Sequence, residues 1–335
     1  MNIYIISPNR IWGGAATANM AIAQMLSKEH NVYYNDEYNK VQIDGVIYDS
    51  FPTHKLKNTK SFLEHLHLKR IDVVIWGLVM VIPYYRKATK LLYKQGIKQF
   101  AIFHSLNIVN SFKGKLMERL VAMSLKHIDE LVFVSKYTDV SWSKKYGTIR
   151  KHPNHRVIYN PTSVDEGNII NTTSHRIGYV GRFSEEKQPE LFAQLSIYDD
   201  VNKYIAWGDG PLLGALAKNY PKVDFKGQSS DQKEMYESID ILVMTSKFEN
   251  CPMVILEAWK YGIPCVVPAV GGIPEIVING YNGLLYEDFS THAIVDCINL
   301  IKENYTNYSK NSLESVKKFS FNCLYRKWEE ILINE

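Results

Sequence analysis

Residues 241–268 read ILVMTSKFENCPMVILEAWKYGIPCVVP, and this stretch shows how the whole chain is built. It opens on an apolar run at Ile241–Met244, passes through a polar loop into a helical pattern at Pro252–Tyr261, and closes on a second apolar run at Cys265–Val267. Short apolar runs bounded by turn residues are typical of buried parallel strands, and helical patterns between them are typical of helix-covered sheets. The stretch therefore predicts an α/β fold.

The same alternation continues through the rest of the chain. Before this stretch, strands are predicted at Asn2–Ser7, Asp72–Trp76, Phe100–Phe103, Glu130–Val134, Arg176–Val180, Lys203–Trp207 and Val223–Phe225. At roughly 100–200 residues per domain, 335 residues suit two domains. We expect two facing Rossmann-like, doubly wound domains, residues 1–165 and 166–310, with a polar linker at 161–174. Ligands of such sheets bind beyond the carboxyl ends of the strands, so a cleft is expected between the domains.

Two glutamates frame the loop and helix of the opening stretch, Glu249 before the helix and Glu257 more than a turn inside it. Pro252 suits the first helical turn, where its missing N–H costs nothing, and a helix that starts there points the amides of Met253 and Val254 outward. Such a helix end attracts anions, and the flanking carboxylates can accept hydrogen bonds from hydroxyl groups. The combination fits a nucleoside diphosphate that carries a sugar, although a helix with two incidental glutamates has the same spacing.

Two cations follow the strand predicted at 176–180. The strand ends at Gly181, and Arg182 and Lys187 come next, five residues apart. Arginine can grip phosphate with a planar fork, and lysine adds a mobile point charge. The same pattern also fits exposed cations beside acidic neighbours. A further loop, 208–210, reads Gly-Asp-Gly, which suits either a close approach to a ligand or a tight turn.

Taken in order, these segments resemble the GT4 family of retaining GT-B glycosyltransferases, which build bacterial lipopolysaccharide, capsule and related glycans. The resemblance covers most of residues 176–290 and includes Gly262-Ile263-Pro264 and the loop Gly271-Gly272-Ile273-Pro274-Glu275. It implies transfer of a sugar from a nucleotide-sugar, a UDP-sugar by family frequency, to a glycan or lipid-linked glycan in surface-polysaccharide biosynthesis. It also implies roles: Arg182 and Lys187 neutralise the donor diphosphate, Glu249 contacts the sugar, and Glu257 contacts the ribose.

The first half resembles the family more loosely. Trp12-Gly13-Gly14-Ala15 follows the first strand like the family's glycine loop, and His104 ends the strand at 100–103 like the family's sugar-contacting histidine. Without the resemblance, His104 would be interpreted as an ordinary core or surface histidine. The resemblance further implies that residues 1–165 form the acceptor side, that 166–310 hold the donor, and that the helix in 311–335 crosses back to the first domain. It implies front-face attack, with the leaving phosphate helping to deprotonate the acceptor.

The expected site residues follow from this resemblance. Those expected to act in catalysis are His104, Glu249, Arg182 and Lys187. Those expected to bind the donor are Gly13, Gly14, Gly181, Gly208, Asp209, Gly210, Asn250, Cys251, Pro252, Met253, Val254 and Glu257. We expect no cofactor and no metal, because the sequence has no Asp-x-Asp motif and its cations and helix amides can do a metal ion's work.

The two halves of the chain differ in charge. Residues 1–165 carry 23 Lys and Arg against 12 Asp and Glu, a formal charge of +11, whereas residues 166–335 carry 16 against 23, a charge of −7. Basic segments at Lys113–Lys126 and His54–Arg70 favour an anionic membrane surface, unless they are helices with one core face and one solvated face. With no signal peptide and no spanning apolar run, we expect a cytoplasmic protein, peripheral on the inner face of the membrane, with no nucleic-acid partner.

Other interpretations of the same scaffold stay open. A nucleotide-sugar 2-epimerase would act on the free donor without an acceptor, and a non-catalytic nucleotide-sugar-binding protein would keep the donor site alone. An NAD-dependent dehydrogenase is disfavoured because the sequence has no Gly-x-Gly-x-x-Gly fingerprint.

Overall fold

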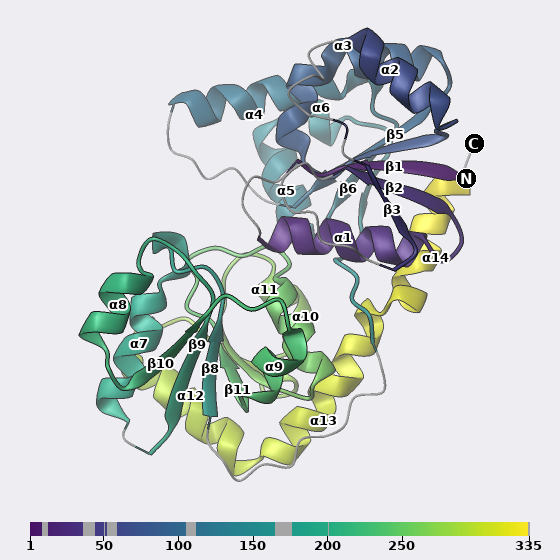
Figure 1. Cartoon of the computed structure of the whole chain (residues 1–335). Helices are drawn as coiled ribbons and strands as arrows, with labels where there is room; N and C mark the ends of the chain where they lie inside the picture. The colour runs from purple at the N-terminus through teal and green to yellow at the C-terminus, as the bar shows by residue number, and fades with distance from the viewer. Residues whose placement is uncertain are drawn as a thin grey trace. The chain divides into compact units, whose positions relative to one another are not determined.

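The structure, a computed structural model, divides into two compact units (Figure 1). Unit 1 comprises Met1–Ser163 and Phe321–Glu335, and unit 2 comprises Val164–Ser320. The structure describes residues 1–8, 13–35, 44–49, 51, 59–104, 112–164, 176–199 and 201–333. The predicted boundary between residues 165 and 166 lies outside the described residues, as does most of the predicted linker.

Unit 1 is built on a parallel sheet of seven strands. In chain order they are β1 (Asn2–Ile6), β2 (Asn31–Asn35), β3 (Val46–Asp49), β4 (Val73–Trp76), β5 (Lys98–Phe103), β6 (Glu130–Phe133) and β7 (His155–Val157). They pair in the order β3-β2-β1-β4-β5-β6-β7, every pair parallel. Every residue of β4 and β6 is buried, as expected for strands covered on both faces.

The helices of unit 1 pack on this sheet. They are α1 (Gly14–Leu26), α2 (Thr59–Leu68), α3 (Arg86–Lys94), α4 (Phe112–Ser124), α5 (Lys136–Lys145), α6 (Gly147–Arg150) and α14 (Phe321–Ile333), with 3-10 turns η2 (Val79–Tyr85) and η3 (Leu125–His127). Aromatic rings fill the core beneath them, where Phe103 lies 4.5 Å from Phe133 and 5.1 Å from Trp142 between ring centroids. The turn η2 contains Pro83 and leads directly into α3.

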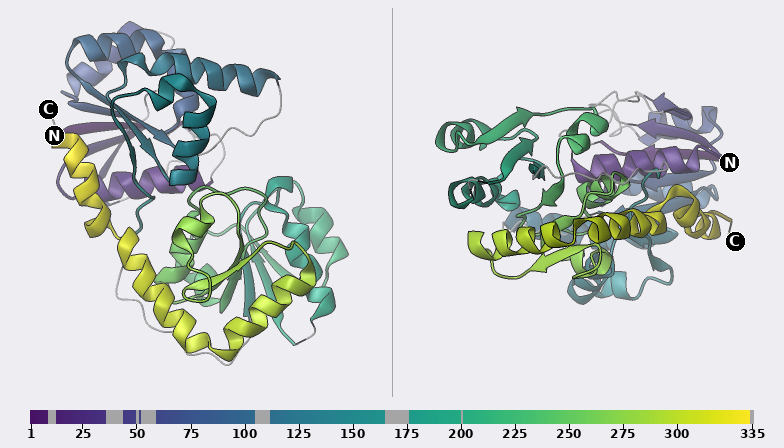
Figure 2. Two further views of the ribbon diagram at one scale, coloured as in Figure 1. Left: turned by 180° about the vertical axis from the view of Figure 1, so that it is seen from behind. Right: turned by 90° about the horizontal axis from the view of Figure 1, so that it is seen from below.

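The C-terminal helix α14 belongs to unit 1 and packs against α1 (Figure 2). It buries Phe321, Leu324 and Trp328. The ring of Tyr325 stacks on His30 at 6.1 Å, and Lys98 donates a hydrogen bond to the carbonyl oxygen of Leu332 at 3.1 Å. The helix is therefore tied to unit 1 by both apolar and polar contacts.

Unit 2 is built on a second parallel sheet, of six strands. In chain order they are β8 (Arg176–Val180), β9 (Lys203–Trp207), β10 (Val223–Gly227), β11 (Ile241–Val243), β12 (Cys265–Pro268) and β13 (Gly283–Tyr286). They pair in the order β10-β9-β8-β11-β12-β13. The two sheets match the doubly wound α/β architecture predicted from the alternation of strand and helix patterns.

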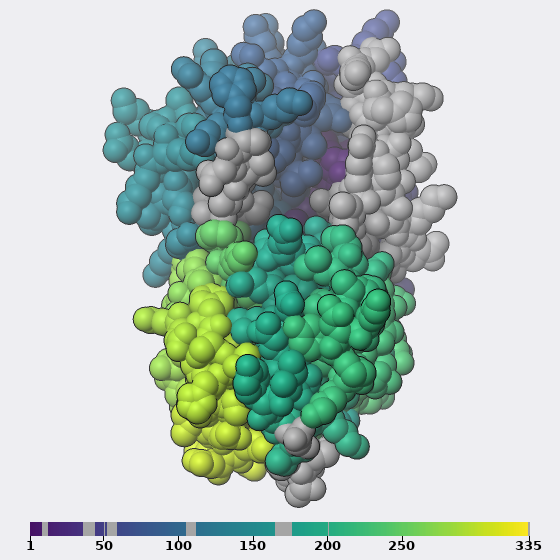
Figure 3. Space-filling view, turned by 90° about the vertical axis from the view of Figure 1, so that its left-hand side faces the viewer, coloured from purple at the N-terminus to yellow at the C-terminus, as the bar shows by residue number. Residues whose placement is uncertain are grey.

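Helices cover both faces of the sheet of unit 2. They are α7 (Pro189–Tyr198), α8 (Leu213–Asn219), α9 (Gln232–Glu237), α10 (Met253–Lys260), α11 (Ile273–Ile276), α12 (Thr291–Glu303) and α13 (Tyr305–Val316), with 3-10 turns η4 (Glu185–Lys187) and η5 (Lys317–Phe319). On one face α7 packs against α12, and on the other α10 packs against α9 and α13. Figure 3 looks onto the first of these layers, with α12 in yellow-green, α7 in teal and α8 in green.

The segment that returns to unit 1 is shorter than the predicted 311–335. Residues up to Ser320 stay with unit 2, because α13 packs against α10. The fit is close at Gly262, where a Cβ atom would lie 2.8 Å from Ser309 Oγ. The ring of Phe319 then packs near Trp259, at 6.4 Å between centroids. The return to unit 1 begins at Phe321 instead of residue 311.

Candidate active site

The order of strands in unit 2 defines where its loops diverge. From β8 the chain proceeds outward through β9 and β10, and it then returns to place β11 on the other side of β8. The loops that follow β8 and β11 therefore leave the carboxyl edge of the sheet in opposite directions, at a topological switch point. Ligands of open α/β sheets bind at such points.

The turn η4, after β8, carries Lys187 to this switch point. Gln188 follows with a left-handed φ of +46° and precedes α7, whose first residue is Pro189. The buried hydroxyl of Thr245, two residues after β11, lies 2.9 Å from the carbonyl oxygen of Lys187 and 2.8 Å from that of Gln188, and its single hydrogen can be donated to either. The Lys247 amide donates to the carbonyl oxygen of residue 186 at 2.9 Å. The exit of β11 thus holds the backbone that carries Lys187.

Lys187 and Glu249 meet across the switch point. The Lys187 Nζ atom lies 2.5 Å from Glu249 Oε1, although 62 residues separate them along the chain. The Lys187 side chain is 30% exposed and that of Glu249 is 10% exposed, so the ion pair is sheltered but reachable from solvent. The sequence predicted both residues for the site, and the structure brings them together.

The glycine loop after β12 supports Glu249 from behind. Gly271 has a left-handed φ of +59°, and a Cβ atom built on it would lie 1.8 Å from the carbonyl oxygen of Glu249. The amide of Gly272 donates a hydrogen bond to the same oxygen at 3.1 Å. The backbone at Glu249 can lie where it does only because residue 271 has no side chain.

Helix α10 begins at Met253, one residue later than predicted, with Pro252 as its N-cap. Cys251, Pro252 and Met253 are buried and Val254 is half-buried. The amides of Met253 and Val254 have no acceptor within the helix, so this helix end offers hydrogen-bond donors and a partial positive charge to an anion. The loop that bears Glu249 leads directly into this end.

Glu257, one turn further along α10, is buried, and each of its carboxylate oxygens accepts one hydrogen bond. Its Oε2 accepts a hydrogen bond from the Tyr236 hydroxyl at 2.7 Å, and its Oε1 accepts one from the Gln232 amide at 3.1 Å. Burial raises the pKa of the Glu257 carboxyl, and the hydrogen bond from Tyr236 opposes that rise. Burial also raises the pKa of Tyr236 well above its ordinary value, so its hydroxyl keeps its proton and donates. The two partners fix the direction in which Glu257 can receive a further donor.

Backbone packing accounts for the Gly-Asp-Gly loop after β9. Gly208 has a φ of +133°, and its missing Cβ would lie 1.9 Å from the carbonyl oxygen of Gly181. Gly210 has a φ of +155°, with Phe183 O 2.5 Å from the position of its Cβ. The exposed Asp209 bonds its carboxylate to the amide of Gly210 at 2.7 Å. Because these two glycines have no side chain, the segments after β8 and β9 can pack closely against each other. Contact of this loop with a donor stays a prediction.

Arg182 follows Gly181 on the same strand-end segment. Its side chain is half-buried, and its carbonyl oxygen accepts a hydrogen bond from the hydroxyl of Tyr179 at 2.8 Å. The structure thus places Arg182 and Lys187 on one segment after β8. Asn250, predicted to bind the donor, is half-buried beside Glu249 in the loop before α10.

The predicted residues of unit 1 lie at or beside its own switch point, which falls between β1 and β4. Gly13 caps α1 with an extended backbone, and Gly14, exposed, has open space where a Cβ would be. His104 follows β5, and its Nε2 lies 2.7 Å from Oδ1 of Asn19 on α1. Burial lowers the pKa of His104 to about 4, so the ring is neutral near pH 7.

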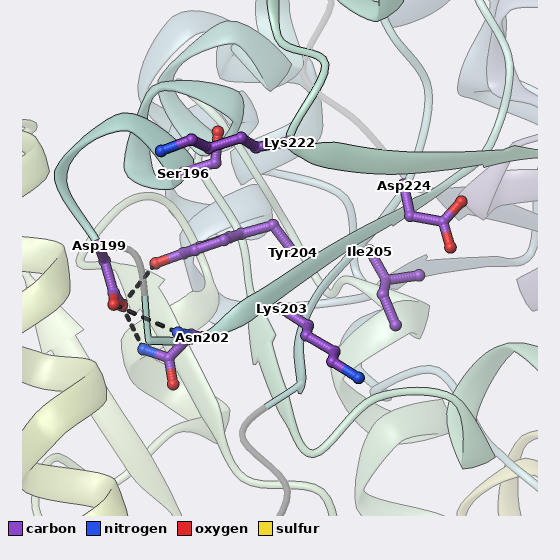
Figure 4. A pocket seen from close by; sticks show the side chains of 8 residues that line it. All are labelled: Ser196, Asp199, Asn202, Lys203, Tyr204, Ile205, Lys222 and Asp224. Atoms are coloured by element: carbon purple, nitrogen blue, oxygen red, sulfur yellow. Dashed lines mark hydrogen bonds between the residues drawn. The ribbon is translucent and has the colours of Figure 1, made fainter.

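A groove of about 400 Å³ in unit 2 lies away from these residues, beside the amino ends of β9 and β10 (Figure 4). The carboxylate of Asp199 is one of the groups that line this groove. This group accepts hydrogen bonds from the Tyr204 hydroxyl at 2.9 Å, from the Val201 amide at 2.9 Å and from the side chain of Asn202. Because the carboxylate is satisfied within its own turn, and the groove is at the opposite edge from the switch point, we assign it a structural role.

Several residues at these sites carry no signal in the sequence. Tyr236, Gln232, Thr245 and Asn19 act through contacts with residues far away in the chain, and none belongs to a recognisable motif.

Among the described residues no group of three or more His, Cys, Asp or Glu side chains could hold a metal ion. No helix in the described part of the chain is long and apolar enough to cross a membrane.

Residues 163–319 match the family model of glycosyl transferases group 1. Over its whole length the chain shares the GT-B fold, as shown by HepE of Anabaena, solved in complex with UDP and glucose. That structure superposes with a TM-score of 0.83 over 100% of this chain and 99% of its own, at 15% identity.

Three relatives of known name are similar in sequence. The GDP-mannose-dependent alpha-mannosyltransferase of Corynebacterium glutamicum is 30% identical over 51% of this chain and 41% of its own length. The UDP-Gal:alpha-D-GlcNAc-diphosphoundecaprenol alpha-1,3-galactosyltransferase of Escherichia coli is 29% identical over 42% of each protein. The N-acetyl-alpha-D-glucosaminyl L-malate synthase of Bacillus anthracis is 23% identical over 90% of this chain and 85% of its own. The matches to the first two thus span less than half of those relatives.

Proposed function

We propose that the chain is a retaining glycosyltransferase of the GT4 type that works without a metal ion. It transfers a sugar from a UDP-sugar to a glycan or lipid-linked glycan acceptor in bacterial surface-polysaccharide biosynthesis. The observation that carries this proposal is the contact between Lys187 and Glu249, 2.5 Å long, across the switch point of unit 2 and on the loop that leads into α10.

The donor site would form around this contact. A diphosphate can replace the Glu249 carboxylate on Lys187, with Arg182 and the first amides of α10 as further partners. Glu249 is then released to accept a hydrogen bond from a hydroxyl of the donor sugar. Glu257, held by its two partners, would accept one from the ribose.

The chemistry needed at this site is the stabilisation of charge on a leaving group. When the bond between sugar and diphosphate breaks, negative charge grows on the diphosphate, and fixed cations and amides lower the barrier most in a preorganised site. Loss of one such donor typically lowers kcat about 10²–10³-fold. Lys187, Arg182 and the helix amides can supply this stabilisation, which supports a mechanism that does not need a metal ion.

Similar proteins support the choice of substrates. UDP is bound in the HepE structure, and the Escherichia coli relative is named for a UDP-sugar donor and a diphosphoundecaprenol-linked acceptor. The Corynebacterium relative is named for a GDP-sugar, so GDP-sugars belong in the test. We propose a cytoplasmic location, where nucleotide-sugars are made.

Helix α4 supports the further proposal of attachment to an anionic membrane. Its buried residues are Gly114, Glu118, Val121, Ala122 and Ser124, whereas the side chains of Phe112, Leu116 and Met123 are exposed to 83%, 48% and 55%. These three positions recur near whole helical turns and so share a face. Around them the helix and the turn after it expose the cations Lys113, Lys115, Arg119 and Lys126. Apolar side chains ringed by cations suit an interface of anionic lipid.

The donor proposal is tested by incubating the protein with UDP-, GDP- and ADP-sugars, with and without a lipid-linked glycan. We expect slow release of nucleotide from one donor alone and much faster release with the acceptor. Lys187→Ala should slow transfer about 10²–10³-fold. The matched control is Lys226→Ala, which removes a surface ion pair with Asp224 and should leave transfer unchanged.

Other outcomes of this experiment would replace the proposal. A changed sugar on the free nucleotide, without acceptor, would identify an epimerase. Binding of donor without any turnover would identify a binding protein, and an inverted anomer in the product would overturn retention.

Membrane attachment is tested separately with anionic liposomes at low salt. Phe112→Ser combined with Met123→Ser should abolish binding, whereas Ile197→Ser, on an exposed apolar residue of unit 2, should not. Equal binding by all variants would overturn the role of α4.

A further inference from the structure

A buried polar network joins the strands that flank the switch point of unit 1. Asn19, fully buried on α1, lies 2.8 Å through Nδ2 from the carbonyl oxygen of Gly77, just after β4. The same nitrogen lies 2.9 Å from the hydroxyl of Ser7, just after β1. A Cβ atom on Gly77 would lie 2.6 Å from Asn19 Nδ2, so the glycine makes room for the amide.

These contacts decide which way the Asn19 amide points. A backbone carbonyl can only accept, so the group that faces Gly77 must be the NH₂ of the amide. One of its hydrogens goes to Gly77 and the other to Ser7, and the amide oxygen is left to face Nε2 of His104 at 2.7 Å. Since this oxygen can only accept, the Nε2 atom of His104 must carry a hydrogen.

The second nitrogen of the His104 ring is then defined as well. Burial lowers the pKa of this histidine, so the ring is neutral near pH 7 and has a single N–H. With that hydrogen on Nε2, Nδ1 is a bare acceptor. This atom is buried, and within the part of the chain that the structure describes it has no hydrogen-bond partner. Leaving a buried acceptor unpaired costs about 1–3 kcal/mol, which a donor from a ligand would recover.

We propose that Asn19 is a positioning residue that locks His104 in the Nε2–H tautomer and thereby reserves Nδ1 to accept a hydrogen bond from a hydroxyl group of the substrate. The lock itself depends only on the contacts among Asn19, Ser7, Gly77 and His104. That the hydroxyl belongs to a sugar rests on the proposed function. Asn19 touches no substrate in this scheme and acts through the ring of His104.

The lock is tested first without any substrate. Nitrogen-15 chemical shifts of histidine rings distinguish a protonated from an unprotonated nitrogen, and the signals of His104 are assigned by their loss in His104→Asn. We expect protonated Nε2 and bare Nδ1 from pH 6 to pH 8, and in Asn19→Ser a mixture of the two tautomers. The opposite tautomer in the wild type, or an unchanged spectrum in Asn19→Ser, would overturn the lock whatever the protein's activity.

The role of Nδ1 is tested by a pair of amide substitutions that leave Asn19 in place. In His104→Asn the side-chain oxygen can lie near the position of Nδ1, whereas in His104→Gln the amide reaches the position of Nε2. We expect His104→Asn to keep at least tenfold more kcat/KM than His104→Gln. Equal loss, or better activity in His104→Gln, would overturn the use of Nδ1. If no variant and no wild type transfers sugar, the proposed function fails while the spectra still decide the lock.

Discussion

The support that Gly271 gives to Glu249 leads to a prediction whose size follows from the structure. In Gly271→Ala the new Cβ would lie 1.8 Å from the Glu249 carbonyl oxygen, whereas real Cβ atoms essentially never come closer than 3.0 Å. The loop must therefore move by about 1.2 Å, the difference between these distances, and the hydrogen bond from the Gly272 amide is strained. A misplacement of about 1 Å in an active site can cost about 10²-fold in rate.

The expected stability change combines two effects. An L-residue in the left-handed region costs about 1–2 kcal/mol, and overpacking adds about 1–3 kcal/mol. Gly271→Ala should thus lower the free energy of unfolding by about 2–5 kcal/mol. Gly280→Ala is the matched control, because Gly280 has a φ of +79° in the same unit and nothing within 4 Å of its missing Cβ. It should lose only the first 1–2 kcal/mol or so, with unchanged activity.

Denaturant unfolding and initial rates of sugar transfer measure the two effects on the same samples. We expect transfer by Gly271→Ala to fall about 10²-fold at a temperature where the variant is still folded, and transfer by Gly280→Ala to match the wild type. If both variants lose the same stability and keep the same rate, Glu249 is positioned by something other than the space at residue 271. The argument from the missing side chain is then refuted.

Three further substitutions probe the same site. Glu249→Gln removes the carboxylate that would compete with phosphate for Lys187, so calorimetry should show tighter binding of UDP, while the rate of sugar transfer falls. Weaker binding of UDP would contradict the proposal that diphosphate replaces Glu249 on Lys187. Burial raises the pKa of Glu257, so its ionised form lowers the stability of the fold above the ordinary pKa of glutamate. Glu257→Gln should therefore melt at a higher temperature than wild type at pH 7.5, with a smaller gain near pH 4.5. Equal gains at the two pH values would exclude this cause. Thr245→Val removes the hydroxyl donor that faces the carbonyl oxygens of Lys187 and Gln188, so the free energy of unfolding in urea should fall by about 1–3 kcal/mol and UDP should bind more weakly. An unchanged affinity for UDP would mean that Lys187 is held in place without Thr245.

The periodicity of the sequence predicted the main strands and helices of both units. Their strand signals are strong because buried parallel strands are apolar along their whole length, as β4 and β12 are. The strands β2 and β3, NVYYN and VIYD, were not predicted, because polar residues at or near their ends weaken the apolar pattern. The start of α10 was predicted to within one residue, since Pro252 marks it locally.

The sequence by itself determined which candidate groups the chain offers, namely Lys187, Glu249, Glu257 and a helix whose start Pro252 marks. Only the tertiary structure decided which of them meet. The contact of Lys187 with Glu249 exists because β11 lies beside β8, and the support from Gly271 exists because β12 lies beside β11. Local patterns are set by the neighbours of each residue, whereas the order of strands depends on the packing of the whole sheet, and so the partners of each group could not be predicted from spacing.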